Sequence, residues 1–162
     1  FIAALFGVTS GDFAALMNRA FPDRKLYLFD TFEGFDSKDL ELDNKYSKAK
    51  KNDFADTTID VVLSKMKYKQ NVIVKKGYFP DSIGDLEDRF CFVSLDADLY
   101  KPTYEGLKYF YPRLVEGGAI FIHDYNSSRY RGVEVALKEY SKIQKIKYVP
   151  LSDSCGSVII LK

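Results

Sequence analysis

The sequence predicts an α/β protein in which a doubly wound, mostly parallel sheet carries helices on both faces. Short apolar runs alternate along the whole chain with segments whose apolar residues recur at helical spacing. Several apolar runs stop at an acidic residue, which places carboxylates at the ends of the predicted strands. The 162 residues contain no internal repeat and no interdomain linker, so we expect a single domain over 1–162.

Seven short runs rich in apolar and β-branched residues have the length and composition of buried strands. They lie at 1–8, 25–29, 72–74, 90–95, 119–122, 147–149 and 157–161. The first five are separated by connections long enough for parallel crossovers. Only residues 150–156 separate the last two, which is typical of a hairpin, so we expect one antiparallel strand there.

Four segments place apolar residues three or four positions apart, as the buried face of a helix requires. They cover 12–20, a segment from a start at 56–58 to residue 66, and about 102–114 and 132–143. Pro22 ends the first, a short helical turn is expected after Pro80, and Gly117-Gly118 predicts a stop before the next strand. Residues 33–53 are polar and aperiodic, which predicts a mobile lid or excursion.

Composition and charge argue against several classes of function. A formal net charge of +1 argues against a nucleic-acid-binding surface, and the basic run 45–51 has enough acidic neighbours to be a solvated loop. No apolar stretch approaches the roughly 20 residues that span a bilayer, and no signal peptide is visible. Cys91 and Cys155 both lie in apolar contexts and are interpreted as core thiols in a reducing compartment. We therefore expect a cytoplasmic protein without membrane or nucleic-acid partners.

Acidic residues at the ends of two predicted strands indicate a metal site. The run 90–95 ends in Asp96-Ala97-Asp98, and the run 118–122 ends in His123-Asp124. In an open α/β sheet the ligand crevice lies beyond the carboxyl ends of the strands, so neighbouring strands would bring these side chains together. Clustered carboxylates repel each other unless a cation binds them, and a hard divalent cation fits oxygen ligands best.

The roles within this cluster stay open. Asp96-Ala97-Asp98 is compatible with a metal ligand or base, with a helix N-cap before Pro102, and with the metal motif of enzymes that use nucleotide sugars. Asp98 need not face the same ion as Asp96. His123 is the only histidine, and a lone histidine is more often structural, but its place at a strand end beside Asp124 favours a role in the site.

A second group of residues indicates a nucleoside ligand. Gly7 and Gly11 flank the turn between the first strand and the first helix, where glycines allow backbone to approach a ligand closely. Asp30 ends the second strand about 20 residues later, where an acidic residue commonly binds ribose hydroxyls. The pair favours an adenosine-type ligand over a simple tight turn. Phe79, with Tyr78 beside it, follows the third strand, where a ring can pack on a purine.

Taken in order, these motifs resemble the macrocin O-methyltransferase family, metal-dependent enzymes that use S-adenosylmethionine and act on sugars of natural products. The resembling stretches are 6–14, 28–35, 76–81, 95–100, 109–114, 117–118 and 123–125. Asp-Thr-Phe-Glu-Gly-Phe at 30–35 and Asp-Ala-Asp-Leu-Tyr at 96–100 are the most specific of them.

The resemblance implies a seven-stranded, Rossmann-like methyltransferase sheet with its last strand antiparallel. It implies that Gly7, Gly11 and Asp30 hold S-adenosylmethionine. It further implies that Asp96 and the pair His123-Asp124 hold Mg²⁺ or another divalent cation, and that Asp96 is the base for a substrate hydroxyl. The expected partner is a small-molecule hydroxyl acceptor, and relatives of this kind often self-associate, so a homo-oligomer is possible.

The chain differs from the family pattern at three points. Leu5 stands where the family usually has a glutamate that helps to seat the cofactor. His123 stands where members often carry the first residue of an acidic pair, and Mg²⁺ prefers oxygen to imidazole nitrogen. The chain also begins inside an apolar run without the helices that precede the first strand in the family, so we expect upstream sequence to be missing.

The sequence thus predicts a metal-assisted O-methyltransferase with Asp96 and His123 as catalytic residues. In-line methyl transfer needs an aligned hydroxyl, a cation to acidify it and a group to accept its proton. Two alternatives stay open at this stage. One is a metal-dependent glycosyltransferase that uses the Asp-x-Asp motif, and the other is a truncated or degenerate fold without activity.

Overall fold

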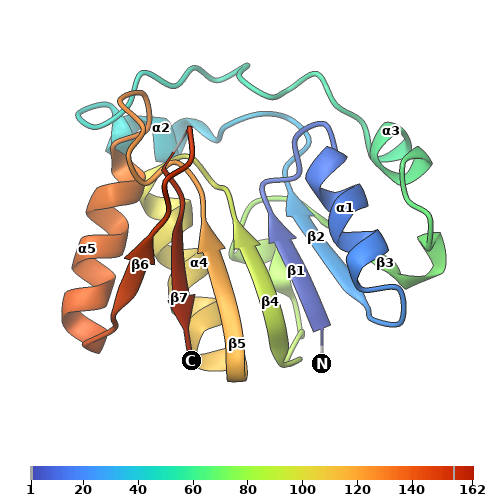
Figure 1. Cartoon of the computed structure of the whole chain (residues 1–162). Helices are drawn as coiled ribbons and strands as arrows, with labels where there is room; N and C mark the ends of the chain where they lie inside the picture. Colours follow the sequence, from blue (N-terminus) through green and yellow to red (C-terminus); the bar gives the residue numbers. More distant parts are fainter. Residues whose placement is uncertain (1, 155) are drawn as a thin grey trace.

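A computed structural model describes residues 2–154 and 156–162, and it consists of one seven-stranded sheet with helices on both faces (Figure 1). The strands are β1 (Ile2–Phe6), β2 (Leu26–Asp30), β3 (Val72–Lys76), β4 (Phe90–Leu95), β5 (Leu114–Ile122), β6 (Tyr148–Pro150) and β7 (Val158–Leu161). The helices are α1 (Asp12–Ala20), α2 (Ser37–Asp43), α3 (Ile59–Ser64), α4 (Tyr100–Arg113) and α5 (Gly132–Gln144), with 3₁₀ turns at Lys69–Asn71 and Asp81–Ile83.

The strand order is β3-β2-β1-β4-β5-β7-β6. The β1–β2, β1–β4, β2–β3 and β4–β5 pairs are parallel, whereas β7 is antiparallel to both β5 and β6. The prediction of a mostly parallel, doubly wound sheet with an antiparallel last strand is confirmed. Because the chain order turns back between β1 and β4, the crevice expected of such sheets lies at the carboxyl ends of these two strands.

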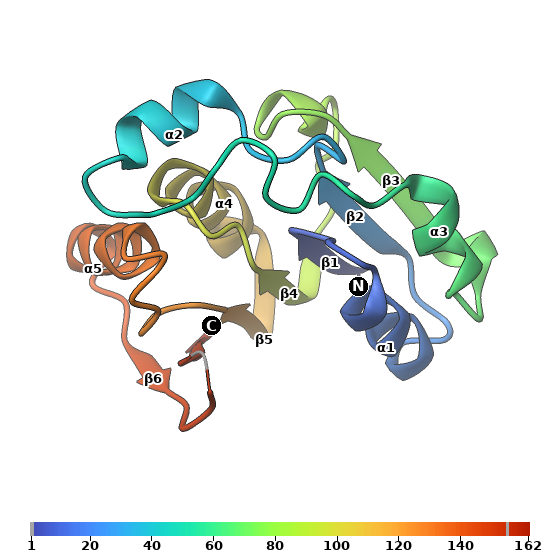
Figure 2. The ribbon, with the colours of Figure 1, turned by 90° about the horizontal axis from the view of Figure 1, so that it is seen from above.

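Two apolar clusters hold the helices on the sheet, one on each face. Alternate residues of the strands supply the two clusters, so Phe6 faces α4 and α5 whereas Leu5 faces α1 and α3. Figures 1 and 2 show α1 and α3 on one face and α4 and α5 on the other. The helices fix the strands in register, and the residues just beyond the carboxyl ends of the strands are free to form a site.

The connection between β2 and α3 crosses above the carboxyl edge of the sheet (Figure 2). The prediction of an irregular excursion over 33–53 was incomplete, because α2 lies inside it. The helix begins after Asp36, whose side chain accepts a hydrogen bond from the N–H of Lys38 (2.8 Å). The buried residues of α2 are Asp39 and Asp43, so its buried face is acidic and has no apolar periodicity for a sequence pattern to detect.

Three smaller expectations need comment. Gly117-Gly118 was wrong as a stop, because both glycines lie inside β5, which begins directly after α4. Cys91 is a free thiol, and Cys155 lies outside the described residues, as does Phe1. Among the helices of the described part, none combines the length and apolar character needed to cross a membrane.

One buried carboxylate ties α2 to the starts of two other helices. Asp43 is 1% exposed, and its Oδ1 accepts a 2.7 Å hydrogen bond from the N–H of Tyr100, the first residue of α4. Gly132, the first residue of α5, lies so close that a Cβ there would overlap Asp43 Oδ1. Oδ2 is buried without a hydrogen-bond partner in the described residues, and burial raises the pKa of Asp43.

This clamp predicts different effects for two substitutions. Asp43→Asn keeps an oxygen for the Tyr100 N–H, whereas Asp43→Ala removes it, so Asp43→Ala should lower the free energy of unfolding by about 1–2 kcal/mol relative to Asp43→Asn. Urea unfolding of both variants measures the difference. Equal stabilities would show that the carboxylate does not hold α4.

The same residue predicts a pH effect of known sign. The folded-state pKa of Asp43 is raised, so the folded protein holds this proton more tightly than the unfolded chain does. The ionised carboxyl therefore destabilises the fold above the raised pKa, and this cost is lost as the pH falls through it. Relative to Asp43→Asn, the unaltered chain should gain stability between pH 7 and pH 4. A relative loss over that range would contradict the assignment.

Candidate active site

The turn after β1 is held against the end of β2 by the Asp30 carboxylate. Oδ2 accepts hydrogen bonds from the backbone N–H groups of Val8 (2.7 Å) and Thr9 (3.4 Å), and Oδ1 accepts one from Phe32 (2.8 Å). Several amide donors hold a carboxylate in one orientation, and Oδ1, which accepts one hydrogen bond, keeps a further lone pair for another donor. The structure thus brings the glycine turn and Asp30 together at one point of the carboxyl edge.

Gly7 is the residue that lets this turn pass the end of β4. Its φ is +87°, and a Cβ at this position would lie 1.8 Å from the carbonyl oxygen of Asp96. The carbonyl of Phe6, the residue before Gly7, accepts a 2.8 Å hydrogen bond from the N–H of Asp96. Only glycine fits here, because any side chain would separate the ends of β1 and β4.

The other predicted nucleoside-binding residues have different surroundings. Gly11 lines neither of the cavities described below, and a Cβ there would lie 3.0 Å from the methyl groups of Val62, so its small size serves the packing of α1 on α3. Phe79 lines the first cavity but is almost fully buried against Phe6, with ring centroids 4.5 Å apart. Leu5 is buried in the α1 cluster and reaches neither cavity.

The acidic ends of β4 and β5 meet as the sequence predicts. Asp96, His123 and Asp124 each offer a ligand atom, and these atoms lie within 4.8 Å of one another. His123 Nδ1 is 3.3 Å from Asp96 Oδ1 and 3.4 Å from Asp124 Oδ2. One nitrogen and two carboxylate oxygens at this spacing form a donor set that suits a divalent cation.

His123 is held between the two carboxylates by charge. Nδ1 is buried, and neither contact has hydrogen-bond geometry, so the atom has no hydrogen-bond partner in the described part of the chain. The contacts with Asp124 and then with Asp96 raise the pKa of His123. Burial alone would raise the pKa of Asp124, but His123 and Asp98 outweigh it and lower that pKa. This nitrogen and the two carboxylates that it faces form a possible three-ligand set for a metal ion.

Asp98 is a third acidic group at this point, and its role is not apparent from the sequence. It is 6% exposed and has a positive φ of 58°. Burial first, and then the neighbouring carboxylates of Asp96 and Asp124, raise the pKa of Asp98 well above its ordinary value. Ionisation of Asp98 is therefore less favourable than that of an exposed carboxyl.

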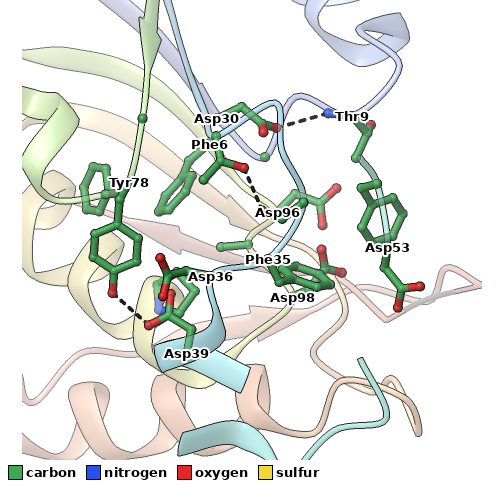
Figure 3. A pocket seen from close by; sticks show the side chains of 18 residues that line it. Phe6, Thr9, Asp30, Phe35, Asp36, Asp39, Asp53, Tyr78, Asp96 and Asp98 are labelled. Atoms are coloured by element: carbon green, nitrogen blue, oxygen red, sulfur yellow. Dashed lines mark hydrogen bonds between the residues drawn. The ribbon is translucent and has the colours of Figure 1, made fainter. Parts of the chain in front are cut away.

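Two cavities meet at this cluster. The first has a volume of about 600 Å³, its open mouth included, and runs from Asp30 past Phe6 and Phe79 to α2 (Figure 3). The second, of about 920 Å³ on the same measure, is lined by His123, Asp124 and Tyr130. Both cavities include Asp96 and Asp98 in their walls. Asp96 thus stands where a molecule in one cavity would face a molecule in the other, and His123 and Asp124 stand beside it in the wall of the second cavity.

The excursion between β2 and α3 contributes to the walls of both cavities and is attached to the segment that follows β5. Phe54 lines each cavity, and Asp53 accepts a 2.6 Å hydrogen bond from Arg129, which follows β5. A β-bridge between Ser47 and Tyr130 adds a backbone attachment nearby. The segment predicted as an excursion therefore supplies walls to both cavities.

Asp39 and Tyr130 are among the wall residues that sequence reasoning missed. Asp39, on α2, lines the first cavity, and Tyr130 lines the second with a buried hydroxyl that has no partner among the described residues. Neither follows a strand, which was the signal used to find the other residues. The short Asp36–Asp39–Asp43 spacing, three and then four residues, places these acids along one side of a helical turn and was the available signal for Asp39.

The profile described as Macrocin-O-methyltransferase (TylF) matches residues 12–154. No curated protein matches the chain.

Solved structures share the fold. The O-methyltransferase NovP has a TM-score of 0.82 and 22% identity over 99% of this chain and 71% of its own. CalS11, a calicheamicin methyltransferase, has a TM-score of 0.77 and 20% identity over the same shares. An O-methyltransferase from Bacillus cereus in complex with SAH has a TM-score of 0.67 and 13% identity over 99% of this chain and 73% of its own. With a match over most of its length, the chain belongs to the macrocin O-methyltransferase family.

Proposed function

We propose that the chain is an S-adenosylmethionine-dependent O-methyltransferase that uses a divalent cation to methylate a hydroxyl of a sugar or natural-product acceptor. The observation that supports this most strongly is the position of Asp96, His123 and Asp124 at the junction of two cavities. Transfer between two bound molecules needs such a junction. NovP and CalS11, which share the fold, are described as methyltransferases, and CalS11 also as a TDP-rhamnose 3'-O-methyltransferase.

The first cavity fits an adenosyl group. Its wall combines the rings of Phe6 and Phe79, which suit a purine, with Asp30, whose Oδ1 keeps a lone pair for a ribose hydroxyl. The absence of a side chain on Gly7 leaves backbone exposed to the cavity beside the candidate metal ligands. Leu5, in place of the usual glutamate, removes no group from this wall because it faces the α1 cluster.

The second cavity would take the acceptor. When bound, S-adenosylmethionine supplies a methyl group on a sulfonium, and a divalent cation lowers the pKa of an acceptor hydroxyl. Asp96, His123 and Asp124 would hold the cation. Asp96 lines both cavities, so its carboxylate is placed to accept the hydroxyl proton, with His123 as the other candidate.

Family membership favours methyl transfer over glycosyl transfer. The Asp-x-Asp interpretation also required Asp96 and Asp98 to face one ion together. Among the described residues, the atoms close enough for a common ion belong to Asp96, His123 and Asp124, and Asp98 is not one of the group.

Ligand binding tests the proposal directly. In a thermal-shift titration, S-adenosylhomocysteine should raise the melting temperature, because it binds the first cavity and only the folded protein has that cavity. A uridine diphosphate sugar should leave the melting temperature unchanged. Stabilisation by the nucleotide sugar alone would favour the glycosyltransferase, and stabilisation by neither would favour a fold without activity.

Asp96→Asn separates the metal role from the cofactor role. The variant should lose methyl transfer to glycoside acceptors, by roughly 100-fold or more, because it loses a charged ligand and the proposed base. Its affinity for S-adenosylhomocysteine, measured by calorimetry, should change less than about threefold, because Asp30 and the glycine turn are intact.

Asp12→Asn is the matched control, because Asp12 is an exposed carboxylate at the start of α1 that lines neither cavity. It should change neither quantity. Loss of S-adenosylhomocysteine binding in Asp96→Asn would assign Asp96 to the cofactor site instead.

The single imidazole predicts a metal preference. Because Mg²⁺ prefers oxygen ligands and imidazole suits later transition metals, the chain should bind Co²⁺ more tightly than Mg²⁺. His123→Asp supplies a third carboxylate, so the ratio of the Mg²⁺ to the Co²⁺ dissociation constant should fall by about tenfold or more. Calorimetric titration with each metal measures this ratio.

His123→Asn is the control, since its amide is a weaker ligand than imidazole or carboxylate. It should weaken the binding of both metals. An unchanged ratio in His123→Asp would show that His123 does not contact the cation.

A further inference from the structure

Asp39 is an acidic residue of the first cavity that the proposed mechanism does not use. It lies on α2, which crosses above the sheet edge, and it is only 5% exposed although it lines the cavity. Figure 3 places Asp30 and Asp39 at opposite sides of the cavity, with Phe6 between them. The cavity thus has a carboxylate at each end and an apolar wall in the middle.

The Asp39 carboxylate is fixed through one of its two oxygens. Oδ1 accepts a 2.8 Å hydrogen bond from the hydroxyl of Tyr78 and lies 3.4 Å from the ammonium of Lys101. That ammonium also stands 5.1 Å from the centre of the Tyr78 ring, so the three side chains support one another. No donor among the described residues contacts Oδ2, which leaves an oriented acceptor at this end of the cavity.

Burial raises the pKa of Asp39, whereas the contacts with Tyr78 and Lys101 oppose that shift. Asp39 lines the cavity and its Oδ2 accepts no hydrogen bond from the described residues, so a ligand that supplies an N–H at this place would gain a hydrogen bond to a fixed carboxylate. A ligand that presents an oxygen there would instead be repelled. The wall therefore discriminates between ligands by the hydrogen-bonding group they carry at this end.

We propose that Asp39 Oδ2 accepts a hydrogen bond from the exocyclic amine of adenine and so selects adenosyl over inosyl ligands. The inference rests on the proposed function, because it assumes that the adenosyl group occupies the first cavity. With the ribose at Asp30, the purine lies along Phe6 and Phe79 toward α2. The amine of adenine is a donor, and the corresponding group of hypoxanthine is a carbonyl acceptor.

The test compares two ligands by calorimetry, S-adenosylhomocysteine and S-inosylhomocysteine. In the second, a carbonyl replaces the amine at the 6-position and the neighbouring N1 carries a proton. The unaltered chain should bind the adenosyl ligand roughly 10- to 100-fold more tightly, as expected for a hydrogen bond to a charged acceptor. In Asp39→Asn the preference for the adenosyl ligand should be lost, because an amide that keeps its oxygen for Tyr78 presents N–H groups to the ligand. Asp39→Asn also keeps an acceptor for Tyr78.

Two further variants make the comparison specific. Asp36→Asn makes the same change of charge on the same helix and in the same cavity wall, and asparagine caps a helix as well as aspartate does. It should keep the preference of the unaltered chain. Tyr78→Phe keeps the Asp39 carboxylate and should also keep the preference, which provides a second measurement should Asp39→Asn fail to fold.

Equal binding of the two ligands by the unaltered chain would overturn the inference alone, as would an unchanged ratio in Asp39→Asn. Equal loss of the preference in Asp36→Asn would also overturn it, because the effect would then belong to the general charge of the wall. A loss in Tyr78→Phe would assign the discrimination to the tyrosine. Binding of neither ligand would overturn the proposed function together with this inference.

Discussion

The close approach of Gly7 to the backbone of Asp96 sets the geometry of the whole site. The Asp96 N–H donates to the Phe6 carbonyl, and a Cβ on Gly7 would overlap the Asp96 carbonyl oxygen. The end of β1 and the end of β4 are therefore in direct contact. The glycine turn, held by Asp30, lies on one side of this contact, and the side chain of Asp96 lies at the junction of the two cavities. A substitution that separated the two strand ends would separate the proposed cofactor and metal sites as well.

A second constraint is the concentration of carboxylates around the cavities, which the fold compensates in different ways. Backbone amides surround Asp30, Lys101 and Tyr78 contact Asp39, and Arg129 pairs with Asp53. Asp96 and Asp124 have His123 between them instead, and its Nδ1 has no hydrogen bond in the described structure. Most of these carboxylates have fixed hydrogen-bond donors or cationic side chains beside them. Asp96 and Asp124 have His123, which can itself become a metal ligand when a cation replaces the proton on its ring nitrogen.

Much of this arrangement could be predicted, because acidic residues directly after buried strands must meet at the sheet edge. Asp30, Asp96, His123 and Asp124 follow this rule, and the sheet order brings the last three together. The rule fails for α2, which packs through Asp39 and Asp43 and not through apolar residues. Hydrophobic periodicity cannot detect a helix held by buried carboxylates. It also could not show that Phe79 would be packed against Phe6, or that Gly11 would serve α3, because both depend on neighbours distant in sequence.

The central claim is that one divalent cation binds Asp96, His123 and Asp124 beside an adenosyl group. Crystals grown with Mn²⁺ and S-adenosylhomocysteine test it most directly, because anomalous scattering locates the metal without reference to the protein. The account predicts a single strong peak within coordination distance of all three side chains, with the nucleoside along Phe6 and Phe79. A metal peak elsewhere, or a nucleoside in the second cavity next to Tyr130, would contradict it.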